Sequence, residues 1–260
     1  MSATYPISEI TGAVLAGGRG QRLGGRDKGL ELAAGRPLIE YVLEALKPQT
    51  ATILINANRN LGRYRAYGYR VVEDEAWRIR KPKSRDERDG DAGAARPDQF
   101  LGPLAGISSV LASAATELVL VVPCDTPCLG RDLGHRLFAR LCEQGADISM
   151  AADARRTHPV VALIRRRLAP SLREFLIRGG RKIDLWYAEH HYTTTDFSDT
   201  PEAFMNVNHA SELAGFVRAL EKPLWEDPGG DPGGDPGGDP GGDPGGGPGR
   251  DRAVDSGDAP

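Results

Sequence analysis

The stretch from Thr11 to Lys28 reads TGAVLAGGRGQRLGGRDK, and it predicts a buried strand followed by an anion-binding loop. Thr11–Leu15 is short and apolar, as is typical of a strand in the middle of a sheet. The five glycines that follow allow the backbone to turn sharply and to present its N–H groups to an anion. Three arginines and a lysine, among them Arg22 and Lys28, add positive charges that suit the phosphates of a nucleoside triphosphate.

Two common phosphate-binding patterns do not fit this loop. The pattern GxxxxGK[ST] is absent, because Lys28 is followed by Gly29. The dinucleotide pattern GxGxxG also fails. Gly18 and Gly20 supply its first two glycines, but the third would have to stand at Leu23 and comes one place late, at Gly24. In addition, no acidic residue ends the next expected strand. A flexible, solvated basic loop is the alternative to the nucleotide site.

The rest of the chain alternates between apolar strand patterns and helical patterns. The expected strands are 52–56, 69–72, 118–122, 147–151 and 160–164. The expected helices are 37–46, with a proline at its first position, 59–66, 103–113, 131–144, 168–177 and 210–220. This order predicts an α/β fold, with a mainly parallel sheet and helices on both faces. In such sheets ligands bind beyond the carboxyl ends of the strands.

Polar residues follow several of these strands. Asn56 ends the second strand, where it would either cap a helix or read a base or ribose. Asp74 follows the third strand, where its carboxylate would either be solvated or contact the ribose or base of a nucleotide. Asp125 follows a wholly apolar strand, where it would hold a phosphate-bridging Mg²⁺ or cap a helix. The glycine-rich loop favours the Mg²⁺ interpretation.

Other residues with reactive or polar side chains are assigned more ordinary roles. Cys124 is interpreted as a small buried residue and not as a nucleophile, and Trp186 as a core residue. Arg181 and Lys182 are interpreted as a solvated helix start. For His158 two roles stay open, contact with the acceptor substrate or stabilisation of a turn.

Composition divides the chain. The tetrapeptide Asp-Pro-Gly-Gly repeats five times from Asp227, and it cannot build a core. We therefore expect one ordered domain at residues 8–222 and a disordered repeat tail at 223–260. The charged stretch 78–99, without periodicity, is expected to be a disordered insertion in the domain.

Bulk properties exclude several classes of protein. The 260 residues carry a formal net charge of only −3, so neither nucleic acid nor a membrane surface is an expected partner. The N-terminus MSATYPISEI lacks the pattern of a signal peptide. Three cysteines make an odd number without zinc-site spacing, and we expect reduced thiols in the cytoplasm.

The motifs LAGGRGQRLGGRDKGL, PLIEYVLEAL, INANRN, VVEDEA, GPLAGI, VPCDTP, HPVVAL and FMNVNHASEL follow one another in this chain. Together they resemble the molybdenum cofactor guanylyltransferases, from about Thr11 to Phe216. The resemblance implies a single Rossmann-like nucleotidyltransferase domain. It also implies transfer of GMP from GTP to molybdopterin with Mg²⁺ as cofactor and release of pyrophosphate. Apart from the resemblance, we expect a monomer. Cofactor-biosynthesis proteins or apo-molybdoenzymes are implied as further partners.

The resemblance also assigns site residues. Arg22, Lys28 and Asp125 would be catalytic, with Asp125 as the metal ligand, and Asn206 and Asn208 would lie on the acceptor side. The implied GTP contacts are Leu15, Ala16, Gly17, Lys28, Asn56, Asp74 and Asp125. Three alternatives stay open: a CTP-dependent relative with the same acceptor, a sugar-1-phosphate nucleotidyltransferase, and a non-catalytic nucleotide sensor.

Overall fold

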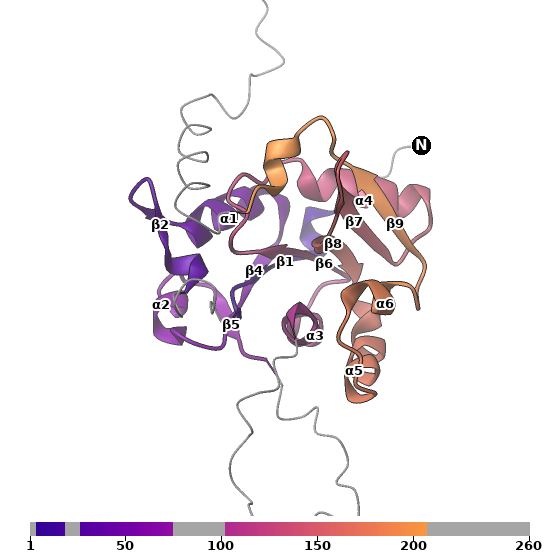
Figure 1. Ribbon diagram of the computed structural model, residues 1–260, viewed down its shortest axis with the longest axis horizontal. Helices are drawn as coiled ribbons and strands as arrows, with labels where there is room; N and C mark the ends of the chain where they lie inside the picture. The colour runs from indigo at the N-terminus through magenta and orange to yellow at the C-terminus, as the bar shows by residue number, and fades with distance from the viewer. Residues whose placement is uncertain (1–3, 19–26, 75–101, 207–260) are drawn as a thin grey trace, which may run out of the picture. The chain divides into compact units, whose positions relative to one another are not determined.

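Seven strands form one sheet at the centre of the protein (Figure 1), whose computed structural model describes residues 4–18, 27–74 and 102–206. The strand order is β5-β4-β1-β6-β8-β7-β9. Their bounds are β1 Ile10–Leu15, β4 Thr52–Asn56, β5 Arg70–Val72, β6 Leu118–Pro123, β7 Ile148–Ala152, β8 Thr157–Arg165 and β9 Tyr192–Asp196. Pairing is parallel except where β8 runs antiparallel to β6 and β7. The sheet is therefore mainly parallel, as the sequence predicts.

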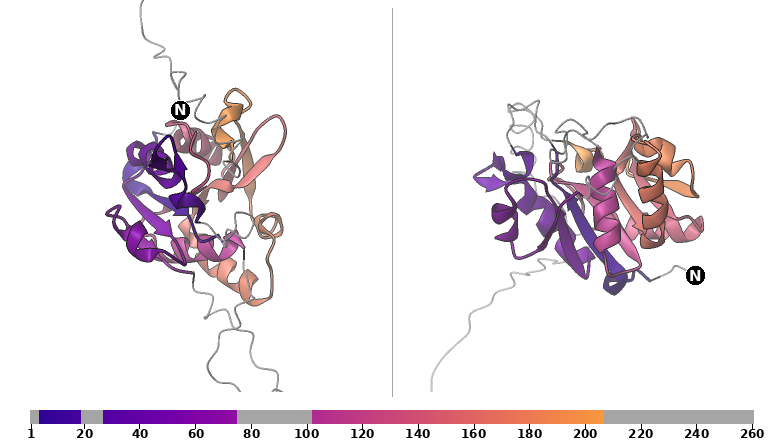
Figure 2. Two further views of the ribbon diagram at one scale, coloured as in Figure 1. Left: turned by 60° about the vertical axis from the view of Figure 1, so that its left-hand side comes forward. Right: turned by 90° about the horizontal axis from the view of Figure 1, so that it is seen from below.

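Helices cover both faces of the sheet (Figures 1 and 2). On one face lie α1 (Leu38–Leu46) and α4 (Leu133–Glu143), and on the other α3 (Pro103–Ser113), α5 (Ala169–Ile177) and α6 (Ile183–Tyr187). The short α2 (Leu61–Arg65) lies between β4 and β5 in the chain. No described helix is long and apolar enough to cross a membrane.

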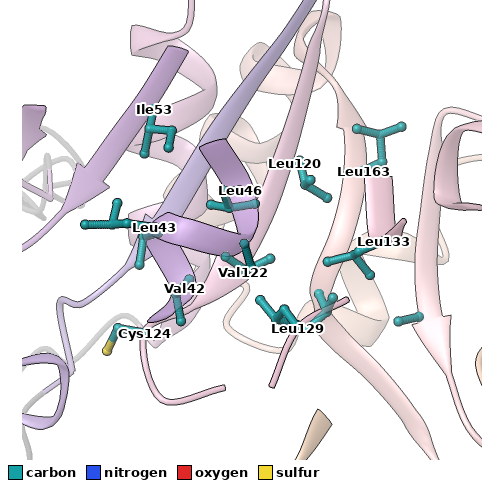
Figure 3. Packing of buried hydrophobic residues seen from close by; sticks show 14 of the residues in the cluster. Val42, Leu43, Leu46, Ile53, Leu120, Val122, Cys124, Leu129, Leu133 and Leu163 are labelled. Carbon is teal, nitrogen blue, oxygen red and sulfur yellow. The ribbon is translucent and has the colours of Figure 1, made fainter. Parts of the chain in front are cut away.

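Each face of the sheet has its own hydrophobic core. Figure 3 shows the α1 side, where Val42 and Leu46 lie near Leu120 and Val122 of β6. Because α1 places its apolar residues at helical spacing, the helix buries one continuous face against the strands. The opposite core includes Trp186, which is fully buried. The interpretation of Trp186 as a core residue is therefore confirmed.

The sequence predicts most described elements to within a few residues, and strand 52–56 and helix 103–113 without error. Pro37 differs from expectation, because it precedes the first helical residue and pairs in the short hairpin of β2 (Leu32–Ala33) and β3 (Arg36–Pro37). This hairpin, α6 and β9 were not predicted. The short 3₁₀ helices η1 (Ile7–Glu9), η3 (Lys28–Leu30), η4 (Lys47–Gln49), η5 (Arg166–Leu168) and η6 (Pro201–Phe204) were not predicted either.

Several predictions concern residues outside the described ranges. They are the roles of Arg22 and Asn208, the helix at 210–220, the insertion at 78–99 and the repeat tail at 223–260.

Candidate active site

A cavity of about 900 Å³ opens at the carboxyl ends of the parallel strands. Register alone brings these ends together, because Leu15 pairs with both Asn56 and Pro123, and Asn56 pairs with Val72. Every site residue that the sequence predicts and the structure describes lines this cavity. They are Leu15, Ala16, Gly17, Lys28, Asn56, Asp74, Asp125 and Asn206.

Asp74 is held by two asparagines on one side of the cavity. Asn56 Nδ2 donates to Asp74 Oδ1 and Asn58 Nδ2 donates to Asp74 Oδ2, both at 2.8 Å. The backbone N–H of Asp74 returns a hydrogen bond to Asn58 Oδ1 at 2.8 Å. Burial raises the pKa of Asp74, while the two amide donors lower it. The cluster is a rigid set of amide and carboxylate groups suited to reading a polar ring edge.

Two glycines allow Asn56 to occupy this position. A Cβ on Gly106 of α3 would lie 2.4 Å from Asn56 Oδ1, and one on Gly17 would lie 3.0 Å from the same atom. A side chain at either position would therefore displace the asparagine. Gly102, which precedes α3, has a φ of 68° and a ψ of −166°, a conformation that is essentially restricted to glycine. The glycines before and within α3 thus shape the side of the cavity that holds Asn56 and Asp74.

Lys28 and Asp125 meet deeper in the site. Lys28 Nζ donates to Asp125 Oδ2 at 2.9 Å, and the two side chains are 29% and 14% exposed. Asp125 lies two residues beyond the end of β6, and Lys28 begins η3. The pair joins a cation suited to phosphate oxygens to a carboxylate suited to a metal ion.

Asp27 anchors the segment that carries Lys28, a role that the sequence does not predict. Its buried carboxylate accepts hydrogen bonds from Tyr64 Oη at 2.5 Å and from Asn60 Nδ2 at 2.8 Å. Both donors come from the α2 region, which follows β4. The signal in the sequence was weak, since a single aspartate beside a lysine in a polar loop is usually solvated.

The other wall of the cavity comes from β8 and η6. Arg156, Thr157, His158, Phe204 and Asn206 line it. Thr126, next to Asp125, donates from Oγ1 to Asn206 Oδ1 at 3.3 Å. The sequence leaves the role of His158 open. It does not single out Arg156, Thr157, Phe204 or Thr126, because nothing in their local pattern sets them apart from strand and turn residues.

The surroundings of Cys124 and Arg181 favour structural roles over chemical ones. Cys124 is buried, and burial raises the pKa of its thiol far above the ordinary range. The thiol is thus protonated and poorly suited to nucleophilic attack. Arg181 Nη1 donates to the backbone oxygens of Leu176 and Gly180. Arg181 and Lys182 do not line the described cavity.

Metal ligands are sparse at the site. Within residues 4–18, 27–74 and 102–206, no group of three or more His, Cys, Asp or Glu side chains could hold a metal ion. Mg²⁺, however, commonly takes one or two carboxylates and completes its shell with substrate phosphates and water. Asp125 fits a metal that arrives with a nucleotide.

Known proteins resemble this chain in sequence and in fold. A family model described as the MobA-like NTP transferase domain matches residues 12–84 and 88–192. A molybdenum cofactor guanylyltransferase of Shewanella pealeana is 43% identical over 201 residues, which cover 77% of this chain and 90% of that protein.

Solved structures share the fold at lower sequence identity. The molybdopterin-guanine dinucleotide biosynthesis protein A of Archaeoglobus fulgidus superposes with a TM-score of 0.61 at 20% identity, covering 82% of this chain and 99% of that one. A Mycobacterium tuberculosis protein described in complex with manganese has a TM-score of 0.53 at 15% identity. The match covers 82% of this chain and 100% of that one.

Proposed function

The chain belongs to the MobA-like NTP transferase family, among the molybdenum cofactor guanylyltransferases, and we propose that it transfers GMP from GTP to molybdopterin and releases pyrophosphate. It is a nucleotidyltransferase enzyme. The observation that carries the proposal is the cavity in which backbone, amide, carboxylate and lysine groups from four strand ends converge.

The nucleoside would bind against β4, β5 and α3. Asp74 accepts one hydrogen bond at each carboxylate oxygen from the asparagines, and a carboxylate has about four acceptor sites. The remaining sites suit the N–H and amino groups on the edge of guanine. The backbone at Leu15, Ala16 and Gly17 would lie against the nucleotide.

The phosphates would lie near Lys28 and Asp125. Asp125 would hold Mg²⁺, whose charge stabilises the triphosphate and the departing pyrophosphate. Lys28, with Arg22 from the glycine-rich loop, would bind the β- and γ-phosphates as charge develops on them. Asn206 and Asn208 would contact the acceptor.

The reaction needs alignment more than acid–base help. The terminal phosphate of molybdopterin is anionic near neutral pH and would attack the α-phosphorus of GTP in line, while the bond to pyrophosphate breaks. No residue of the chain need become covalently attached, which agrees with the buried, protonated thiol of Cys124. Catalysis would therefore rest on alignment of the two phosphates and on neutralisation of their charge.

The test is pyrophosphate release from GTP, CTP and UTP with Mg²⁺ and molybdopterin, with the wild type beside Asp125→Ala. Release from GTP alone, lost in the variant, supports both substrate and metal assignment. Release from CTP or from UTP with a sugar phosphate would move the protein to a neighbouring activity. GTP binding without release from any nucleotide would indicate a sensor.

We also propose that the enzyme is a cytoplasmic monomer. Size-exclusion chromatography with light scattering would test the monomer, and cell fractionation would test the location.

A further inference from the structure

We infer that His158, oriented by Asp153, accepts a hydrogen bond from the pterin ring of the acceptor. The inference rests on the proposed function, which supplies the pterin. In the cavity wall formed by β8 and η6, the polar side chain of His158 is held by both packing and a hydrogen bond. Its side chain is only 9% exposed, yet it lines the cavity.

A shift in strand register brings His158 to the cavity. Along β7, Met150 pairs with Ala162, but the next residue, Ala151, pairs with His158. The intervening residues of β8 therefore bulge from the ladder, and every residue from 156 to 161 lines the cavity. A regular strand would present only alternate residues, and bulges often re-aim side chains beside active sites.

The bulge is fixed from behind. Buried Tyr187 donates from its hydroxyl to the backbone oxygen of Pro159 at 2.7 Å. The imidazole of His158 stacks on Phe204, with ring centroids 4.4 Å apart and an angle of 26° between the planes. Phe204 meets Phe197 edge-on at 5.3 Å. The imidazole is thus held by packing before any ligand arrives.

Asp153 determines which nitrogen of His158 carries hydrogen. Asp153 Oδ1 accepts the backbone N–H groups of Arg155 at 2.7 Å and Arg156 at 2.9 Å, and Oδ2 lies 2.8 Å from His158 Nε2. These partners, His158 first, lower the pKa of Asp153 to about 2. An ionised carboxylate can only accept, so Nε2 carries a hydrogen, and whenever the ring is neutral its lone pair lies on Nδ1.

Nδ1 is then available to a ligand. Among the residues that the structure describes, none forms a hydrogen bond with Nδ1. A pterin offers amino and ring N–H donors along one edge, whereas a phosphate dianion offers only acceptors. The fixed tautomer therefore favours the pterin ring over the phosphate as the partner of His158.

The test compares equilibrium binding of molybdopterin with binding of GTP in His158→Ala, Asp153→Asn and the wild type. His191→Ala is the matched control, because His191 is exposed and does not line the cavity. Loss of one buried hydrogen bond should weaken molybdopterin binding in His158→Ala by about tenfold. GTP affinity should stay within about twofold in all variants.

Asp153→Asn tests the tautomer without removing the histidine. The amide oxygen can still accept the two backbone N–H groups, while the amide nitrogen donates to Nε2 and moves the hydrogen to Nδ1. Molybdopterin binding should weaken here too, while the melting temperature stays near that of the wild type. Unchanged molybdopterin affinity in both variants, or an equal loss of GTP affinity, overturns the inference. Wild-type protein that binds molybdopterin but does not transfer GMP overturns only the proposed function.

Discussion

Lys28 Nζ lies 2.9 Å from Asp125 Oδ2, although the two residues are 97 positions apart in the chain. The ion pair joins the segment after the glycine-rich loop to the end of the central strand β6. The cation that we propose binds the phosphates and the carboxylate that we propose binds the metal are therefore neighbours before substrate binds.

Replacing Lys28 with methionine should impair catalysis far more than folding. We expect kcat/KM for GTP to fall about 10²- to 10³-fold, because the positive charge that stabilises the phosphates is lost. The partly exposed ion pair should contribute no more than about 1 kcal/mol to stability. Pyrophosphate release and thermal unfolding measure the two effects. The control is Lys47→Met, an exposed lysine in η4, and equal losses in both variants would contradict the prediction.

Gly106→Ala should weaken GTP binding by displacing Asn56. The added Cβ would lie 2.4 Å from Asn56 Oδ1, so the asparagine must move and release Asp74. Isothermal titration with GTP should give an affinity lower by about tenfold, the equivalent of one lost hydrogen bond.

Gly62→Ala provides the matched control for that change. Nothing lies within 4 Å of a Cβ at Gly62, which is in α2. Alanine should stabilise the helix by up to about 1 kcal/mol and leave GTP affinity unchanged. Wild-type affinity in Gly106→Ala would show that Asn56 does not contribute to GTP binding.

Tyr64→Phe should lower stability and raise the KM for GTP together. The variant loses the hydrogen bond to the buried carboxylate of Asp27, which is worth about 1.5–3 kcal/mol for a charged acceptor. Since Asp27 precedes Lys28, the lysine should lose its fixed position. Tyr41→Phe is the control, because its hydroxyl donates at 2.8 Å to the backbone oxygen of Ala33 and does not touch the cavity. An unchanged KM in Tyr64→Phe would refute the positioning role.

Cys124→Ser should retain turnover. Burial raises the pKa of the thiol, so the reactive thiolate is scarce at neutral pH. Steady-state pyrophosphate release should stay within about an order of magnitude of the wild type, with any loss due to placing a hydroxyl in an apolar site. Abolished turnover with intact GTP binding would establish a chemical role for Cys124.

Deleting residues 224–260 should leave activity intact. The Asp-Pro-Gly-Gly repeats contain no residue that could build a core, and we propose that residues 8–222 suffice for catalysis. Comparing kcat and KM for GTP in the truncated and full-length proteins tests this domain boundary. A large fall in kcat would assign the repeats a part in the reaction.

Sequence by itself was enough for the mainly parallel sheet and for the residues that we propose contact the nucleotide. Apolar strands and helical spacing are local patterns, and parallel strands necessarily end on one edge of the sheet. Residues at or just beyond the ends of those strands, such as Asn56, Asp74 and Asp125, are therefore expected to lie together, and they line one cavity. The family resemblance added Asn206, which lies far along the chain from these strand ends.

Elements without a strong local pattern were missed. The edge strand β9 has the sequence YTTTD and is largely exposed or half-buried, so its apolar signal is weak. The hairpin of β2 and β3 has only two residues in each strand. Tertiary pairing stabilises both elements, and that pairing is not visible in a short window of sequence.

Only the tertiary structure decided which side chains contact one another at the site. Asp27 accepts a hydrogen bond from Tyr64, 37 positions away in the chain. Lys28 pairs with Asp125, and a register shift between β7 and β8 brings His158 to the cavity. Hydrogen bonds and ion pairs form only within about 3–4 Å, and such distances between residues remote in sequence follow from how strands, loops and helices pack together. The sequence determines which chemical groups are present, but the packed fold determines which of them meet.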